Sequence, residues 1–195
     1  SFQVGRGSQT LEFSSAAPSA TVDGAAYTPT FVRGHSVSLV GLSISPASSA
    51  DCEVSSGSII FHSVGDCVVD ANQDADANYE AAPTVSQTIT VTRGNQVPLE
   101  AISSITNLIL GEQNPTAVVS LSGGSGSGAV AWQISAESQS VCSIDGDVVT
   151  GFATGFCELN VTKDGDGNYL QAVTTLTLTV STGGQIPVQV NLSDE

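Results

Sequence analysis

The sequence Asp51–Ala82, DCEVSSGSIIFHSVGDCVVDANQDADANYEAA, returns ninety residues later as Val141–Ala172, VCSIDGDVVTGFATGFCELNVTKDGDGNYLQA. Both copies have the same cysteine spacing, and both carry a tyrosine at the same distance beyond the second cysteine. An alternating apolar triplet upstream repeats at the same offset: Val40, Leu42 and Ile44 match Val130, Trp132 and Ile134. Agreement of cysteine, tyrosine and strand pattern indicates an internal duplication.

The edges of the repeat are marked by a second phrase. VGRGSQ at Val4–Gln9 matches VTRGNQ at Val91–Gln96, and VSTGGQ at Val180–Gln185 is a third copy. These phrases predict one domain over 1–92 and a second over 93–181, with 182–195 as the start of a further repeat or a C-terminal tail. The chain contains no methionine, so we expect it to be a piece of a longer tandem array.

The composition favours an all-β protein. The chain has 195 residues, of which 40% are hydrophobic, and short Val/Ile/Thr runs are broken by Gly, Asn, Asp and Pro. The copied segments place Cys67, Val69 and Ala71, and likewise Cys157, Leu159 and Val161, on one face of a strand. Six or seven such strands in about 90 residues are typical of a β-sandwich. The sequence therefore predicts two tandem sandwiches and no helix.

The charge is strongly one-sided and excludes some partners. Nineteen acidic residues against four basic ones give a net charge of −15. Such a chain repels nucleic acid and anionic membrane surfaces. No apolar run reaches the roughly 18 residues of a membrane-spanning helix. We therefore expect neither nucleic-acid binding nor direct membrane insertion.

The four cysteines predict one disulfide in each domain, Cys52–Cys67 and Cys142–Cys157. Each bridge would close a loop of about 16 residues, which stabilises the fold by roughly 3 kcal/mol in the chain-entropy model. Disulfides persist in oxidising compartments, so this pairing predicts a secreted or surface location. Four free buried thiols are the alternative. A zinc site would need closely spaced ligands of the Cys-x-x-Cys kind, and the sequence has none.

The two long copied phrases resemble tandem bacterial immunoglobulin-like repeats of large secreted or surface adhesin-like proteins. That family shows the same order of cysteine, strand, Gly-Cys strand and an acidic phrase ending in Tyr-x-x-Ala. The resemblance covers roughly 170 residues. It implies an immunoglobulin-like sandwich that serves as a stalk or spacer. The cysteine pair about 60 residues apart that vertebrate immunoglobulin domains carry is absent, which places the bridge elsewhere in the sandwich.

The acidic phrase is the one candidate for a binding site. Asp74, Asp76 and Asn78, and their copies Asp164, Asp166 and Asn168, match the first three ligand positions of an EF-hand. The match then fails, because Tyr79 and Tyr169 stand where the sharp-turn glycine belongs, and Val85 and Thr175 stand where the bidentate glutamate belongs. A looser calcium site is one hypothesis. The other is a turn in which Asp and Asn side chains bond their own backbone. No cofactor is required, and Ca²⁺ is the only candidate.

Catalysis finds little support in the residues. There is no Gly-x-Ser-x-Gly and no His-Glu-x-x-His, and no catalytic residues are assigned. His35 and His62 occur only in the first copy, and Trp132 is expected in the core. The motifs Asn160-Val-Thr and Asn191-Leu-Ser match the asparagine glycosylation pattern, which a bacterial origin would make irrelevant.

We therefore predict a non-enzymatic spacer or stalk of a large extracellular or cell-surface bacterial protein. Its partners would be neighbouring immunoglobulin-like repeats of the same chain. In the first alternative the domains themselves bind a glycan, protein or surface ligand of a host or matrix, with or without calcium. In the second they form an accessory region of a secreted enzyme.

Overall fold

The computed structural model describes residues 4–111 and 115–184. The chain forms two compact units. The first comprises the described residues up to Asn95 together with Asp166–Leu170. The second comprises Gln96–Gly165 together with the described residues from Gln171 onward. The expected domain boundaries stay a prediction, and most of the predicted third segment, from 185 on, lies outside the described residues.

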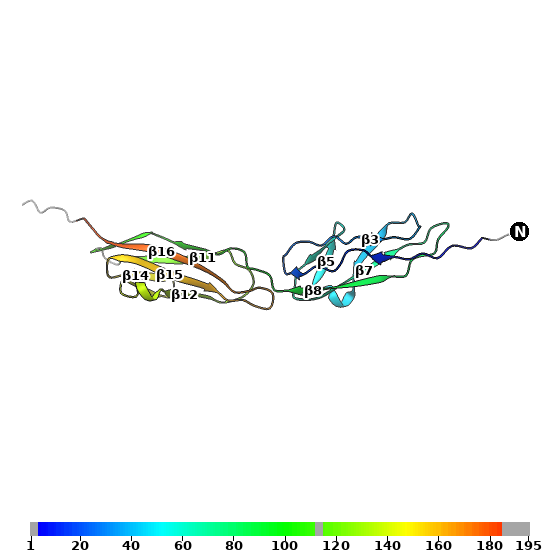
Figure 1. The fold of residues 1–195 in the computed structure, drawn as a ribbon. Helices are drawn as coiled ribbons and strands as arrows, with labels where there is room; N and C mark the ends of the chain where they lie inside the picture. The colour runs from blue at the N-terminus through cyan, green and yellow to red at the C-terminus, as the bar shows by residue number, and fades with distance from the viewer. Residues whose placement is uncertain (1–3, 112–114, 185–195) are drawn as a thin grey trace, which may run out of the picture. The chain divides into compact units, whose positions relative to one another are not determined.

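The second unit is a sandwich of two four-stranded sheets (Figure 1). One sheet has the strand order β10-β16-β15-β12 and the other β13-β14-β11-β9. β10 runs parallel to β16, and the other neighbours are antiparallel. This is the two-sheet topology of the immunoglobulin fold. The strands are β9 (Glu100–Ser103), β10 (Asn107–Leu110), β11 (Thr116–Ser122), β12 (Val130–Ile134), β13 (Cys142–Asp145), β14 (Val148–Gly151), β15 (Gly155–Lys163) and β16 (Ala172–Thr182).

The first unit has one matching four-stranded sheet, of order β2-β8-β7-β4, with β2 parallel to β8. Its second layer is built from the pairs β5-β6 and β1-β3 and from an isolated bridge between Tyr27 and Ile59. The strands are β1 (Glu12–Phe13), β2 (Ala20–Thr21), β3 (Phe31–Val32), β4 (Val40–Ile44), β5 (Cys52–Ser55), β6 (Ser58–Phe61), β7 (Gly65–Gln73) and β8 (Val85–Thr92). The expectation of two all-β, immunoglobulin-like units in tandem is confirmed.

Strand periodicity places the core of each unit where the sequence predicts it. The inward residues of β7 and β15 are fully buried, with exposures of 0%: Cys67, Val69, Ala71, Cys157, Leu159 and Val161. The outward residues of the same strands are polar or partly exposed. Trp132 lies on the edge strand β12 and is only partly buried against the core of the second unit. An edge strand has a neighbouring strand on one side only. A large side chain such as tryptophan therefore stays open to solvent on the other side.

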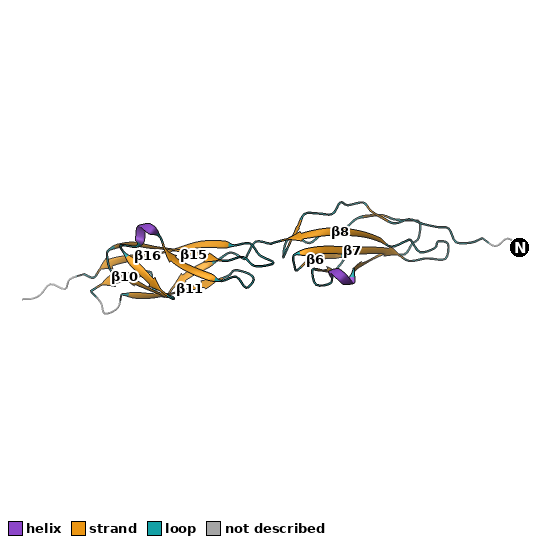
Figure 2. Ribbon diagram, turned by 90° about the horizontal axis from the view of Figure 1, so that it is seen from below, coloured by secondary structure: helices purple, strands orange, loops and turns teal. Residues whose placement is uncertain are grey.

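The described residues contain no α-helix. Two single 3-10 turns, η1 (Pro46–Ser48) and η2 (Ala136–Ser138), follow the edge strands at equivalent places (purple in Figure 2). Each ends on a buried serine that the sequence analysis did not single out. The hydroxyl oxygen of Ser138 donates to the carbonyl of Phe156 and accepts from the backbone nitrogen of Glu158, both at 3.0 Å. It ties the turn to β15. Among the described residues there is also no helix long and apolar enough to cross a membrane.

Candidate functional site

The acidic phrase forms the same turn in both copies, directly after β7 and β15. Asp76 Oδ1 accepts hydrogen bonds from the backbone nitrogens of Asn78 (2.8 Å) and Tyr79 (2.9 Å). Asp166 Oδ1 accepts from Asn168 and Tyr169, both at 2.9 Å. Each turn is closed by a backbone bond from the aspartate nitrogen to the tyrosine carbonyl, 3.0 Å in both. The middle carboxylate of the phrase therefore holds its own backbone, which is the aspartate turn that the second hypothesis describes.

The second carboxylate oxygen of Asp76 also has a backbone partner. Oδ2 accepts from the nitrogen of Val37 at 3.0 Å, so the turn is joined to the loop between β3 and β4. The backbone N–H groups of Asn78, Val37 and Tyr79 favour the ionised carboxylate and lower the pKa of Asp76 below its ordinary value. Negative charge is held here by backbone dipoles.

The remaining predicted ligands do not converge on one point. Asp74 contributes its backbone carbonyl to the hydroxyl of Ser36 at 3.1 Å, and its side chain is exposed. Asp164 Oδ1 accepts from the side chain of Gln171 at 3.3 Å. The part of the chain that the structure describes holds no group of three or more His, Cys, Asp or Glu side chains that could hold a metal.

Calcium binding by Asp74, Asp76, Asn78, Asp164, Asp166 and Asn168 stays a prediction. The residues fit a cation poorly, because the oxygens of Asp76 that would bind it already accept three backbone hydrogen bonds. A calcium ion would have to compete with these backbone donors for the carboxylate or bind through main-chain oxygens.

The repeated Arg-Gly phrase pairs with the tyrosine turn. Gly7 donates to the carbonyl of Asn78 at 2.8 Å and accepts from Glu80 at 2.8 Å. Gly94 makes the equivalent bonds with Asn168 and Leu170, both at 2.9 Å. A Cβ at residue 7 would lie 3.3 Å from the Tyr79 ring, tighter than ordinary contact. At residue 94 the Cβ would instead lie 2.2 Å from the Val22 carbonyl oxygen, so each of the two glycines is required by a close neighbour of its own.

Sequence reasoning missed a buried glutamine that stands two residues after each of these glycines. Gln9 is 7% exposed, donates to the carbonyl of Glu80 at 2.7 Å and accepts from the nitrogen of Ser36 at 3.0 Å. Gln96 is 8% exposed and repeats the arrangement. It donates to the carbonyl of Asp164 at 3.1 Å and accepts from the nitrogen of Ser125 at 3.2 Å. The glutamine at the end of VGRGSQ and VTRGNQ was the available signal.

The last residues of β7 and β15 play the same structural part in the two units, although one is a glutamine and the other a lysine. Gln73 is fully buried and its amide donates to the carbonyls of Ser36 (3.0 Å) and Ser38 (2.9 Å). Lys163, the only lysine of the chain, donates to the carbonyl of Gly128 at 2.9 Å from the equivalent position. Amide and ammonium both tie the strand end to the loop before β4 or β12. We call the buried glutamine and this loop the end cap of each unit.

Each unit contains one disulfide that joins its two layers. Cys52 of β5 is bonded to Cys67 of β7, and Cys142 of β13 to Cys157 of β15, with a Cα–Cα distance of 5.8 Å in both. No cysteine among the described residues is free. The bridges connect strands of opposite sheets, at a different place from the pair typical of vertebrate immunoglobulin domains.

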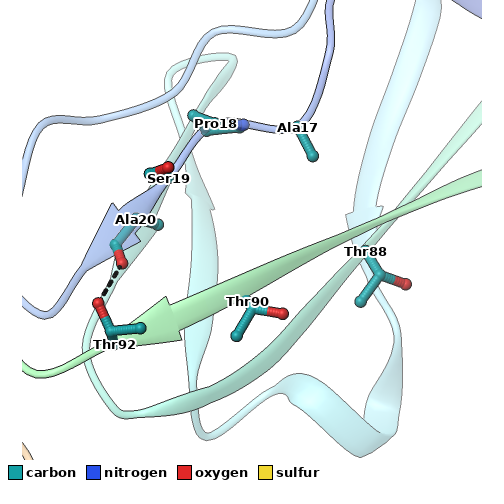
Figure 3. Close-up of a pocket in the computed structure, with 7 residues that line it drawn as sticks. All are labelled: Ala17, Pro18, Ser19, Ala20, Thr88, Thr90 and Thr92. Carbon is teal, nitrogen blue, oxygen red and sulfur yellow. Dashed lines mark hydrogen bonds between the residues drawn. The ribbon is translucent and has the colours of Figure 1, made fainter.

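The first unit also has a groove of about 390 Å³ on a sheet face (Figure 3). Pro18 and Ser19 pass above the outward threonines of β8, and the Thr92 hydroxyl donates to the carbonyl of Ala20 at 3.1 Å. The lining residues are Ala17, Pro18, Ser19, Ala20, Thr88, Thr90 and Thr92. They offer hydroxyls and methyl groups and no acid or base, so the groove has the chemistry of a weak contact surface.

Comparison with known proteins finds similarity only to solved structures, and that similarity is low. No protein-family model matches the chain, and no curated protein matches it. Among solved structures, the surface layer protein SbsC, domains 1–6, is 13% identical with a TM-score of 0.35, and the match covers 91% of this chain and 28% of that one.

Two further solved structures are similar to the same degree. The D00-D0 domain of intimin is 12% identical with a TM-score of 0.33, over 88% of this chain and 98% of that one. Drosophila N-cadherin EC1-3 is 12% identical with a TM-score of 0.33, over 89% and 68%. Likeness this low carries no argument about function. The class of protein, tandem immunoglobulin-like sandwiches, therefore rests on the chain's own strand order.

Proposed function

We propose that this chain is an extracellular structural module, a spacer or stalk formed by immunoglobulin-like units within a large bacterial surface protein of the adhesin type. The observation that carries the proposal is the duplication of one mechanical plan. Each unit has its own disulfide between layers and its own end cap around a buried glutamine. The duplicated acidic residues also have a structural part, because the middle aspartate of each turn bonds the backbone of that turn.

The charge and the disulfides support this location. Disulfides of this kind persist outside the reducing cytosol. The net charge of −15 keeps tandem units soluble and apart from anionic surfaces. Outward strand positions carry mostly threonine, serine and acidic side chains.

Single-molecule force spectroscopy on the whole chain tests the proposal. A stalk should give two separate unfolding events, one for each unit. Each disulfide hides about 15 residues from extension, so reduction should lengthen each event by about 50 Å. Smooth extension without two events would refute a role as a stalk.

The alternative, in which the units themselves bind a ligand, has one observation in its favour. Phe152 and Phe156 of the second unit are 53% and 70% exposed, and exposed aromatic side chains are frequent in binding surfaces. Saturable binding of the purified chain to a matrix protein or a glycan, lost in the double change Phe152→Ser/Phe156→Ser, would support that alternative. An unrelated surface change, Thr177→Ser, is the control.

A further inference from the structure

The outer face of β15 carries an asparagine in the pattern Asn160-Val161-Thr162. Leu159 and Val161 point into the core and are fully buried, while Asn160 between them is exposed. β15 is a central strand, and Asn160 lies opposite Gln133 of β12 and Thr175 of β16. Because side chains alternate along a strand, the Asn160 amide and the Thr162 hydroxyl lie on one solvent-facing surface.

The surface beside Asn160 is open and partly apolar. A shallow groove of about 500 Å³ adjoins the amide, lined by Asn160, Val161, Thr162, Val173, Thr174 and Thr175. Val173 is 71% exposed, and Phe156 on the same face of the sheet is 70% exposed. The Asn160 amide makes no side-chain hydrogen bond within the described part of the chain. A solvent-facing sheet surface with exposed valine and phenylalanine has room for a covering group that is both polar and apolar, as a sugar ring is.

The first unit lacks this acceptor at the equivalent position. Asp70 stands in place of Asn160, and its Oδ1 accepts from the Ser86 hydroxyl at 2.6 Å. Asn72 stands in place of Thr162. The duplication therefore provides a natural control, with the same strand, the same face and a neighbouring groove lined by Asp70 and Asn72.

We propose that Asn160 is a glycosylation site whose first sugars lie over the groove at Thr162, Val173 and Thr175. The donor is an oligosaccharide linked through a diphosphate to a lipid. Asn160 Nδ2 forms a bond to the anomeric carbon, and the carbon–oxygen bond to the diphosphate breaks. The lipid diphosphate leaves with the bonding electrons, and one amide proton passes to a base of the transferase. The proposal rests on the extracellular location proposed above and requires that the source cell possess such a transferase. It therefore replaces the expectation that a bacterial origin makes the Asn160-Val-Thr pattern irrelevant.

The pattern needed for this transfer is present in the folded geometry and in the sequence. Asparagine glycosylation requires Asn-x-Ser/Thr with a residue other than proline between, and valine meets that condition. Glu158 lies two residues before Asn160 on the same face of β15 and is exposed. The acceptor therefore stands on a face whose outward residues are Glu158, Asn160 and Thr162.

Mass spectrometry of the whole chain, secreted from a bacterium that expresses an asparagine oligosaccharyltransferase, tests the proposal. We expect a glycopeptide containing Asn160 whose added mass is lost in Asn160→Gln and Thr162→Ala and kept in Thr162→Ser. The three changes Val68→Glu, Asp70→Asn and Asn72→Thr copy the outward residues Glu158, Asn160 and Thr162 of β15 onto β7. Made together, they should create a second acceptor in the first unit. Asn191→Gln should leave the Asn160 glycopeptide unchanged.

Two results overturn the proposal and separate it from the proposed function. A secreted chain with both disulfides formed and no sugar at Asn160 refutes the glycosylation site and leaves the extracellular module intact. Modification only at the engineered acceptor in the first unit refutes it equally, because the enzyme was then active and rejected Asn160. Recovery of free thiols from the secreted chain would count against the extracellular module itself.

Discussion

Removing the disulfide of the first unit should lower the stability of that unit and leave the second unit unchanged. The change is the double substitution Cys52→Ala/Cys67→Ala, which avoids a free thiol. Both sulfur atoms belong to core residues that are 1% and 0% exposed, so alanine keeps the site apolar. The matched control is Cys142→Ala/Cys157→Ala in the second unit, where the loop has the same length.

The magnitude follows from the length of the closed loop. The separation of 15 residues gives about 3 kcal/mol of stabilisation in the chain-entropy model. Loss of two buried sulfur atoms adds roughly 1 kcal/mol of cavity and transfer cost. A unit of this size changes its Tm by about 4–8 °C per kcal/mol, so the expected decrease is about 15–30 °C.

The single tryptophan makes the assay selective. Trp132 lies in the second unit, so its fluorescence reports the unfolding of that unit alone, and calorimetry reports both. The first-unit variant should split the calorimetric trace and leave the fluorescence transition in place, and the control variant should shift the fluorescence transition. A decrease of less than about 4 °C, or an equal shift of the tryptophan signal in both variants, would refute independent units stabilised by their own bridges.

Four further outcomes are expected. Gln9→Ala should cost the first unit about 1–3 kcal/mol, because two backbone partners lose their hydrogen bonds; Gln96→Ala should do the same in the second unit, and urea denaturation measures both. Gly128→Ala should prevent stable folding of the second unit in a thermal melt, since a Cβ there would lie 1.8 Å from the Asp164 carbonyl, whereas Gly146→Asn, a position with φ of 59° and open space, should be tolerated. The lowered pKa of Asp76 means that its ionised form stabilises the fold above the unfolded value of about 3.8 and that this contribution is lost as pH falls through the lower folded value; Asp76→Asn should flatten the acid end of a stability–pH curve. Titration calorimetry with calcium should show heat and a raised Tm if the acidic turns bind it, and the absence of both would leave them as backbone-anchored turns.

The cysteine pairing and the calcium hypothesis show how differently two sequence signals behave. Equal cysteine spacing in both copies restricts the choice of partners, and the structure contains the two bridges it suggested. The alternating acidic residues suggested a shared cation. In the structure the middle carboxylate bonds the backbone of its own turn. Sequence spacing gives the order of donors and acceptors along the chain, but the local backbone competes for the same oxygens, and its outcome depends on φ and ψ.

The sequence by itself determined the strand pattern, the duplication and the buried faces of β7 and β15. Side-chain alternation and repetition can be read along the chain without knowledge of distant contacts. Only the tertiary structure decided what Gln9, Gln96 and Lys163 do. Each of these polar residues bonds backbone groups that are 27 to 71 positions away. Their burial is favourable only when folding brings those partners into place. The repeated phrases therefore show that the two glutamines recur, but they do not show which groups the glutamines bond. The hydrogen bonds of the end caps therefore follow only from the tertiary structure, whereas the two β-sandwiches could be predicted from the order of the residues.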